Sequence, residues 1–282
     1  MRTTYLKCLP LTLLFLVIEA VPALRGQALS DHAETIQLNQ VSSYSTLPNG
    51  VDLQDGDARM QIVALRQDVI RIRVSRDKNL SEDASWAVLE AARQSRVSVT
   101  AIETADAVGF QTQVLRVSIS RSKFALTVSD REGNILQQDA LPIEFRGSSF
   151  RVYKEMPFDE HYFGLGDKPG PLDRRDQAFT LWNTDAYGFQ ESTDPIYKSI
   201  PYFMTFRSGH AVGIFVDNTW RNSFDFGKQL PHIYSFGAVN GAIRLLLIIW
   251  AYTKASRRDL RMANWDNTAS PYLESRLSTV QI

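Results

Sequence analysis

A two-residue alternation of apolar and polar side chains runs through two neighbouring segments, Ala58-Arg-Met-Gln-Ile-Val-Ala-Leu65 and Val69-Ile-Arg-Ile-Arg-Val74. Successive side chains of an extended strand point to opposite faces of a sheet, so this alternation predicts strands that are buried on one face only. In the second segment, arginines occupy one face while isoleucine and valine occupy the other. The pattern indicates half-buried antiparallel strands.

Further short runs of the same kind follow, separated by turn-forming residues. We predict strands at residues 97–100, 114–119, 124–128 and 150–153, and turns at 48–50, 55–56 and 130–134. Only residues 85–92 could form a helix, of one or two turns, so a parallel sheet would lack its crossover helices. Regularly spaced short strands indicate an all-β sandwich or barrel.

The composition is that of a globular chain. It has 282 residues, 44% of them hydrophobic and 22% charged, enough for one large domain or two small ones. Its 31 basic and 31 acidic residues leave no net charge, so no nucleic-acid partner is expected. One cysteine and four scattered histidines provide no cluster at metal-ligand spacing, and we expect no metal or organic cofactor.

The first 28 residues resemble a secretory signal peptide. Arg2 and Lys7 precede an apolar run at residues 9–18, and small residues follow at 26–28. The run is about half the roughly 20 apolar residues that a membrane span needs. We therefore predict a secreted or periplasmic protein with no membrane span after cleavage; an exported protein that kept its N-terminus would contradict this.

Residues 161–203 interleave aromatic rings, amides and carboxylates with glycine and proline. Sugars present apolar faces that stack on rings, and hydroxyl edges that bind planar polar groups, so this mixture suits carbohydrate recognition. The same residues also fit core packing and turn capping, which composition alone favours. A glycosidase needs two carboxyl groups about 5 to 9.5 Å apart, and sequence proximity gives no acidic pair that geometry, so no catalytic residue is assigned.

Several strings in this region resemble the N-terminal domain of family 31 of the glycoside hydrolases, the α-glucosidase and α-xylosidase group. They include Tyr162-Phe-Gly-Leu-Gly166, Phe179-Thr-Leu-Trp-Asn-Thr-Asp-Ala-Tyr-Gly188 and Thr193-Asp-Pro-Ile-Tyr-Lys198. The resemblance covers roughly residues 50–240. One departure is Asp176, where the family more often has glycine.

The resemblance implies an antiparallel β-sandwich of the galactose-mutarotase-like type, here at residues 29–242, followed in the family by a catalytic (β/α)₈ barrel. It implies that Asp185 contacts substrate and that Tyr197 lies near the same pocket. The nucleophile and general acid lie on the barrel, which we expect to be missing from this chain. The other candidate substrate-binding residues are Trp182, Asn183 and Tyr187.

Residues 243–282 depart from the family pattern and are predicted to be an aberrant tail that replaces the linker to the barrel. Codons for residues 251–258 can be read one base later as Pro-Thr-Pro-Lys-Gln-Val-Val, which resembles the family's linker. We therefore predict a one-base slip between residues 238 and 243, which the nucleotide sequence tests. Alternatively, residues 243–250 form a partner or membrane segment, too short to cross a bilayer, or an edge strand of the sandwich.

Three functional hypotheses follow. The first is the N-terminal domain of an exported α-glycosidase, inactive alone, whose partner is an α-linked oligosaccharide or glycoside bound through the barrel pocket. The second is a self-sufficient carbohydrate-binding sandwich. The third is a mutarotase or lyase, which should pair His161 with Glu155 or Glu160 over an open sheet.

Overall fold

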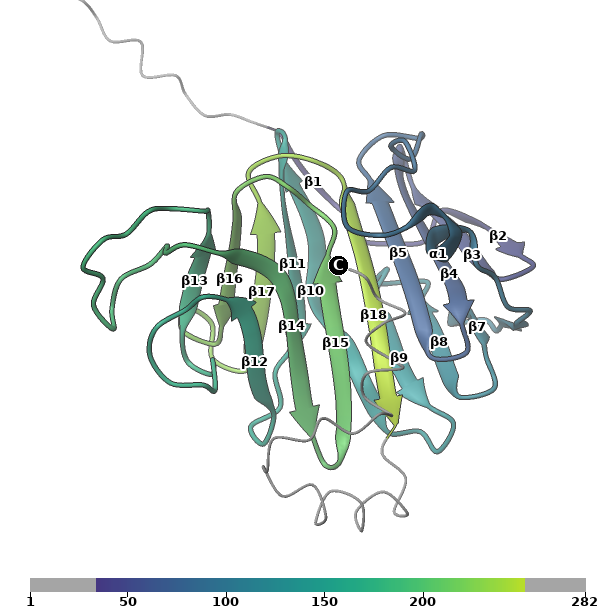
Figure 1. Cartoon of the computed structure of the whole chain (residues 1–282). Coiled ribbons are helices and arrows are strands. Elements are labelled where there is room, and N and C mark those ends of the chain that lie inside the picture. The colour runs from purple at the N-terminus through teal and green to yellow at the C-terminus, as the bar shows by residue number, and fades with distance from the viewer. Residues whose placement is uncertain (1–33, 252–282) are drawn as a thin grey trace, which may run out of the picture. The chain divides into compact units, whose positions relative to one another are not determined.

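The computed structural model describes residues 34–251, so the predicted signal peptide and residues 252–282 lie outside the described part. Residues 34–251 form two antiparallel sheets with the core between them (Figure 1). The prediction of an all-β antiparallel sandwich is confirmed.

One sheet has ten strands and contains the middle of the chain. In spatial order its strands are β13 (Ala178–Leu181), β16 (Asn222–Phe226), β17 (Ile233–Ala238), β11 (Ser149–Glu155), β10 (Ile135–Arg146), β9 (Leu126–Asp130), β8 (Leu115–Ser120), β7 (Ala107–Gln111) and β6 (Thr100–Glu103). β1 (Thr35–Gln37) also pairs with β10.

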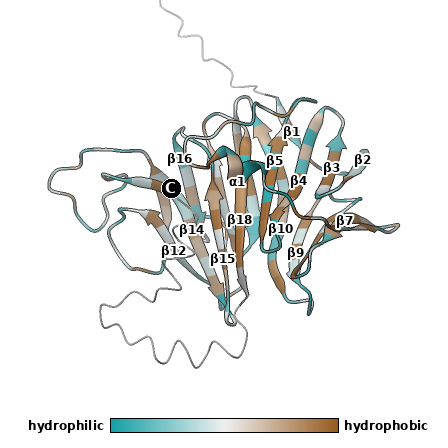
Figure 2. Cartoon of the chain, turned by 45° about the vertical axis from the view of Figure 1, so that its right-hand side comes forward, coloured by the Kyte–Doolittle hydropathy of each residue, from teal (hydrophilic) through white to brown (hydrophobic). Residues whose placement is uncertain are grey.

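The other sheet has eight strands and joins the two ends of the described part. Its order is β12 (His161–Gly166), β14 (Ser199–Arg207), β15 (His210–Val216), β18 (Ile243–Ala251), β5 (Val69–Ser75), β4 (Ala58–Arg66), β3 (Gly50–Asp55) and β2 (Ser43–Leu47). Figure 2 shows apolar residues along β18 and β5, near the middle of this sheet.

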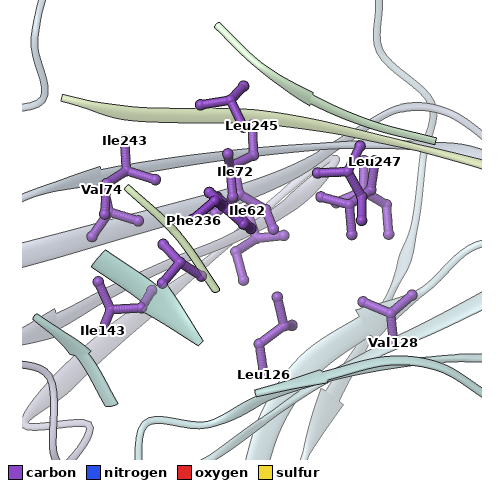
Figure 3. Packing of buried hydrophobic residues seen from close by; sticks show 14 of the residues in the cluster. Ile62, Ile72, Val74, Leu126, Val128, Ile143, Phe236, Ile243, Leu245 and Leu247 are labelled. Carbon is purple, nitrogen blue, oxygen red and sulfur yellow. The ribbon is translucent and has the colours of Figure 1, made fainter. Parts of the chain in front are cut away.

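The alternating segments form β4 and β5, as predicted, in register with each other. Their apolar residues are buried in the core that both sheets share (Figure 3). On the opposite face of β5, Arg71 is also buried, because Asp83 covers it. Two guanidinium nitrogens of Arg71 donate to the Asp83 carboxylate, and Arg93 Nε donates to it at 3.0 Å.

This cluster makes a testable prediction for acid stability. Hydrogen bonding from Arg71 lowers the pKa of Asp83 from its ordinary 3.8 to about 2. The ionised carboxylate therefore stabilises the fold above the unfolded pKa, and that stability is lost as the pH falls from about 4 to about 2. Urea unfolding of Asp83→Asn should show a shallower loss over this range than the wild type or the exposed control Asp106→Asn. Equal slopes for all three would contradict the assignment.

The placement of Ile243–Ala251 corrects two sequence-based expectations. These nine residues form β18, which pairs with β15 on one side and β5 on the other. The edge-strand alternative is therefore wrong, and the sandwich continues past the boundary predicted at residue 242. The reason is that alternate residues of the apolar run fill the core: Ile243, Leu245, Leu247 and Ile249 are buried. The one-base slip stays a prediction.

Two elements lie at positions that differ from the predicted ones. The helix expected at residues 85–92 is α1 (Glu90–Gln94), because the Ser85 hydroxyl accepts backbone N–H groups of the next residues in a turn. The strand expected at 97–100 begins only at Thr100. Strands predicted at 114–119, 124–128 and 150–153 overlap β8, β9 and β11. Within residues 34–251, no helix has the length and apolar character of a bilayer span.

Candidate functional site

All five predicted substrate-binding residues lie in one loop, residues 182–198, which connects β13 of the ten-stranded sheet to β14 of the eight-stranded sheet. The loop extends well beyond the ends of these strands (Figure 1). A long irregular loop held by a rigid sandwich is a common location for binding residues.

The returning arm of the loop is fastened to β13 by an ion pair between the buried Lys168 and the partly exposed Asp194. Lys168 Nζ donates to the Asp194 carboxylate and, at 2.6 Å, to the carbonyl of Thr180. The other carboxylate oxygen of Asp194 accepts the backbone N–H of Thr180. The side chain of Lys168 is fully buried, with 0% exposure, and lies 5.7 Å from the ring centre of Phe179. These contacts fix where the loop leaves the sandwich.

Two of the predicted residues bind within the loop itself. The Oδ1 atom of Asn183 accepts the backbone N–H of Ser199 at 2.9 Å, which closes the neck of the loop. The Tyr197 hydroxyl donates to the carbonyl of Ala186 at 3.1 Å, and its ring packs edge-on against Phe189. Asn183 and Tyr197 therefore shape the loop; contact of either with a sugar stays a prediction.

The other three predicted residues point their functional groups to solvent. Trp182 is 52% exposed and Tyr187 is 98% exposed. Asp185 is exposed and forms no hydrogen bond or ion pair among the described residues. The two exposed rings can stack on the apolar face of a sugar. The Asp185 carboxylate can accept hydrogen bonds from the sugar hydroxyl groups.

The pair expected of a mutarotase or lyase does not form. His161 Nδ1 lies 2.6 Å from a carboxylate oxygen of Asp173, not from Glu155 or Glu160. Glu160 is buried and accepts the hydroxyl of Tyr162. Burial raises the pKa of Glu160, but its position in the core keeps it away from an open sheet face. Residues 34–251 also contain no group of three or more His, Cys, Asp or Glu side chains that could hold a metal ion.

Asp176 and Lys168 are structural determinants near the site. Asp176 adopts a left-handed backbone conformation with φ of 61°, and its N–H donates to the carbonyl of Phe226. Glycine adopts this conformation without strain, which is consistent with the glycine expected here from the family resemblance. Sequence reasoning noted the departure at Asp176 but missed Lys168, because its partner is 26 residues away.

Comparisons with known proteins agree with this architecture. Over 182 residues the chain is 34% identical to alpha-glucosidase 2 of Bacillus thermoamyloliquefaciens, a match that covers 63% of this chain and 23% of the relative. Over 107 residues it is 32% identical to an alpha-glucosidase of Saccharolobus solfataricus, covering 38% of this chain and 15% of the relative. The chain thus spans less than a quarter of either relative.

Among solved structures, the fold is similar to that of a GH31 dextranase from Flavobacterium johnsoniae, complexed with glucose, with a TM-score of 0.71 and 29% identity. The match covers 78% of this chain and 27% of the dextranase. A mutant of the same enzyme was solved with isomaltotriose.

The family comparison identifies the same region that forms the sandwich. The profile of the glycosyl hydrolase 31 N-terminal galactose mutarotase-like domain matches residues 59–225, which is more than half of the chain and includes the loop at residues 182–198. This chain belongs to the glycosyl hydrolase 31 N-terminal galactose mutarotase-like domain family.

Proposed function

We propose that this chain is the N-terminal, sugar-contacting domain of an exported α-glycosidase that hydrolyses α-linked glucosides, and that it is inactive alone. The observation that carries the proposal is the loop at residues 182–198. It is anchored by the ion pair of Asp194 with the buried Lys168, yet it presents Trp182, Asp185 and Tyr187 to solvent. An anchored loop with open polar and aromatic groups is suited to complete a pocket on another domain.

The chemistry would be divided between two domains. In a retaining glycosidase, one carboxylate attacks the anomeric carbon while a second carboxylic acid protonates the leaving oxygen. We assign both groups to a following (β/α)₈ barrel. The carboxylate of Asp185 would accept hydroxyl protons of the bound sugar and orient its ring, while the exposed rings cover an apolar sugar face.

The similarity to sugar-bound enzymes supports the proposed ligand class. The dextranase complexes contain glucose and isomaltotriose, and the two curated relatives are α-glucosidases. We therefore infer an α-linked glucoside or oligosaccharide as the ligand of this loop. Export follows from the predicted signal peptide at residues 1–28.

The inactivity proposal is tested with the purified chain and an aryl α-glucoside. We expect no release of the aryl alcohol above the buffer rate, because both catalytic carboxyl groups are assigned to the barrel. Turnover that follows the chain through purification would refute the proposal.

The role of the loop is tested by titrating the ¹⁵N-labelled chain with isomaltotriose. We expect weak binding, with a Kd of about 1 mM or higher, and shifts confined to amides of residues 182–198. Asp185→Asn and Trp182→Ala should reduce these shifts, while the distant exposed control Asp106→Asn should not. Shifts that are unchanged in both loop variants would contradict the assignment.

The same titration distinguishes this proposal from the alternative, a self-sufficient carbohydrate-binding module. The exposed Trp182 and Tyr187 also favour that alternative. A module complete in itself should bind isomaltotriose about tenfold or more tightly than 1 mM. A pocket that needs the barrel should not, because half of its contacts are absent.

A further inference from the structure

A second polar surface lies on the outer face of the ten-stranded sheet and reaches Thr180 of β13, beside the base of the loop. There, a cavity of about 310 Å³ spans β10, β11, β17, β16 and β13, which are neighbours in the sheet (Figure 1). Its polar lining includes Glu144, Arg146, Arg151, Thr180, Arg221 and Ser223. A volume near 310 Å³ is at the lower end of the roughly 300–1,000 Å³ found for ligand pockets, so it suits one small ring.

Strand register creates the hollow. Gly237 of β17 lies between Arg151 of β11 and Ser223 of β16. A Cβ atom on Gly237 would lie 2.2 Å from the carbonyl oxygen of Phe150, so the close approach of β11 and β17 requires glycine here. Because no side chain rises from the centre of the row, the flanking side chains enclose a depression.

The guanidinium group of Arg151 crosses this depression. It donates to the hydroxyl oxygens of Ser223 and Ser235, each at 3.1 Å. Both partners are neutral, and Arg151 forms no ion pair within residues 34–251. Since each serine oxygen accepts from Arg151, its own hydroxyl proton remains available for a ligand.

The remaining charged side chains, Arg221 and Glu144, give the cavity both a positive and a negative group. The side chain of Arg221 is exposed and forms no hydrogen bond or ion pair with another described residue. Glu144 Oε1 accepts the hydroxyl of Tyr153 at 3.0 Å, which leaves Oε2 as an acceptor. Leaving Arg146 aside, two arginines against one glutamate give a surplus of one positive charge.

We propose that this cavity binds a hexuronate, a sugar ring that carries a carboxylate. The carboxylate would be held by Arg151 and Arg221, because guanidinium groups bind carboxylates with paired hydrogen bonds. A ring hydroxyl would donate to Glu144. Glu144 makes the cavity selective for the sugar over an inorganic oxyanion, because its carboxylate would repel that anion at short range. The site shares no residue with the loop at 182–198, so it does not depend on the proposed α-glucosidase role.

Titration of the purified chain with methyl α-glucuronide tests the proposal, with methyl α-glucoside and inorganic phosphate as matched probes. We expect the glucuronide to bind at least about tenfold more tightly than either probe, because the glucoside lacks the carboxylate that the arginines bind and Glu144 repels phosphate. Arg221→Gln should weaken glucuronide binding about tenfold without affecting the fold, since Arg221 is exposed. Arg151→Gln should weaken it by at least as much.

The matched control is Arg116→Gln, which removes an exposed arginine from β8 of the same sheet and should leave binding unchanged. Asp185→Asn should also have no effect, which separates this site from the loop. Equal affinity for the glucuronide and the glucoside, equal affinity for phosphate, or glucuronide binding that is unchanged in Arg221→Gln would each overturn the proposal.

Discussion

Replacement of Lys168 by methionine is expected to lower the free energy of unfolding by about 2 kcal/mol, below the roughly 3–5 kcal/mol lost when one partner of a fully buried ion pair is removed. Methionine retains the length of the side chain but not its charge, so Asp194 loses its cation. The expected cost is lower because the Asp194 side chain is 21% exposed and still accepts the N–H of Thr180. Urea unfolding of the purified chain measures the change.

The same substitution should loosen the loop. Without Lys168, Asp194 is held to β13 only by the N–H of Thr180, and the returning arm can open. Hydrogen exchange of amides in residues 183–197 should therefore speed up by more than exchange in β4 and β5. The control Lys198→Met removes an exposed lysine from the end of the same loop and should change neither quantity. Stability equal to the wild type would show that the ion pair does not anchor the loop.

The strands of the sandwich could be predicted from sequence where one face is buried. β4 and β5 alternate over much of their length, and the structure buries their apolar face. β18 is different, because its apolar run reveals a strand but not its neighbours. Its partners, β15 and β5, come from opposite ends of the described chain, and only tertiary pairing makes it a central strand.

The candidate site residues came from the family resemblance, because the composition of residues 161–203 alone also fits core packing. The structure exposes Trp182, Asp185 and Tyr187, and their contact with a sugar stays a prediction. Sequence could not reveal that Asn183 closes the neck, since an amide in a loop has many possible partners. The cavity over Gly237 was not anticipated, because it depends on the register of β11 against β17, which are far apart in sequence, as well as on that of β16 and β17.

Truncation of Phe203 should produce the larger loss of stability. Phe203 of β14 is fully buried, and its ring contacts four rings of the opposite sheet at centroid distances of 5.2 to 6.3 Å: Phe224, Phe226, Tyr234 and Phe236. It was one of the aromatic residues that could have bound sugar, and the structure assigns it to the core. Phe→Ala substitutions in cores cost about 3–5 kcal/mol, because a cavity remains beside the lost contacts.

We expect Phe203→Ala to fall within that range, near its upper end, because the ring joins the two sheets directly below the point where the loop enters β14. Phe206→Ala on the same strand is the matched control: this ring is 40% exposed, so its loss should cost about 1 kcal/mol or less. Urea unfolding of both variants gives the comparison. Equal losses would mean that the aromatic cluster does not hold the sheets together.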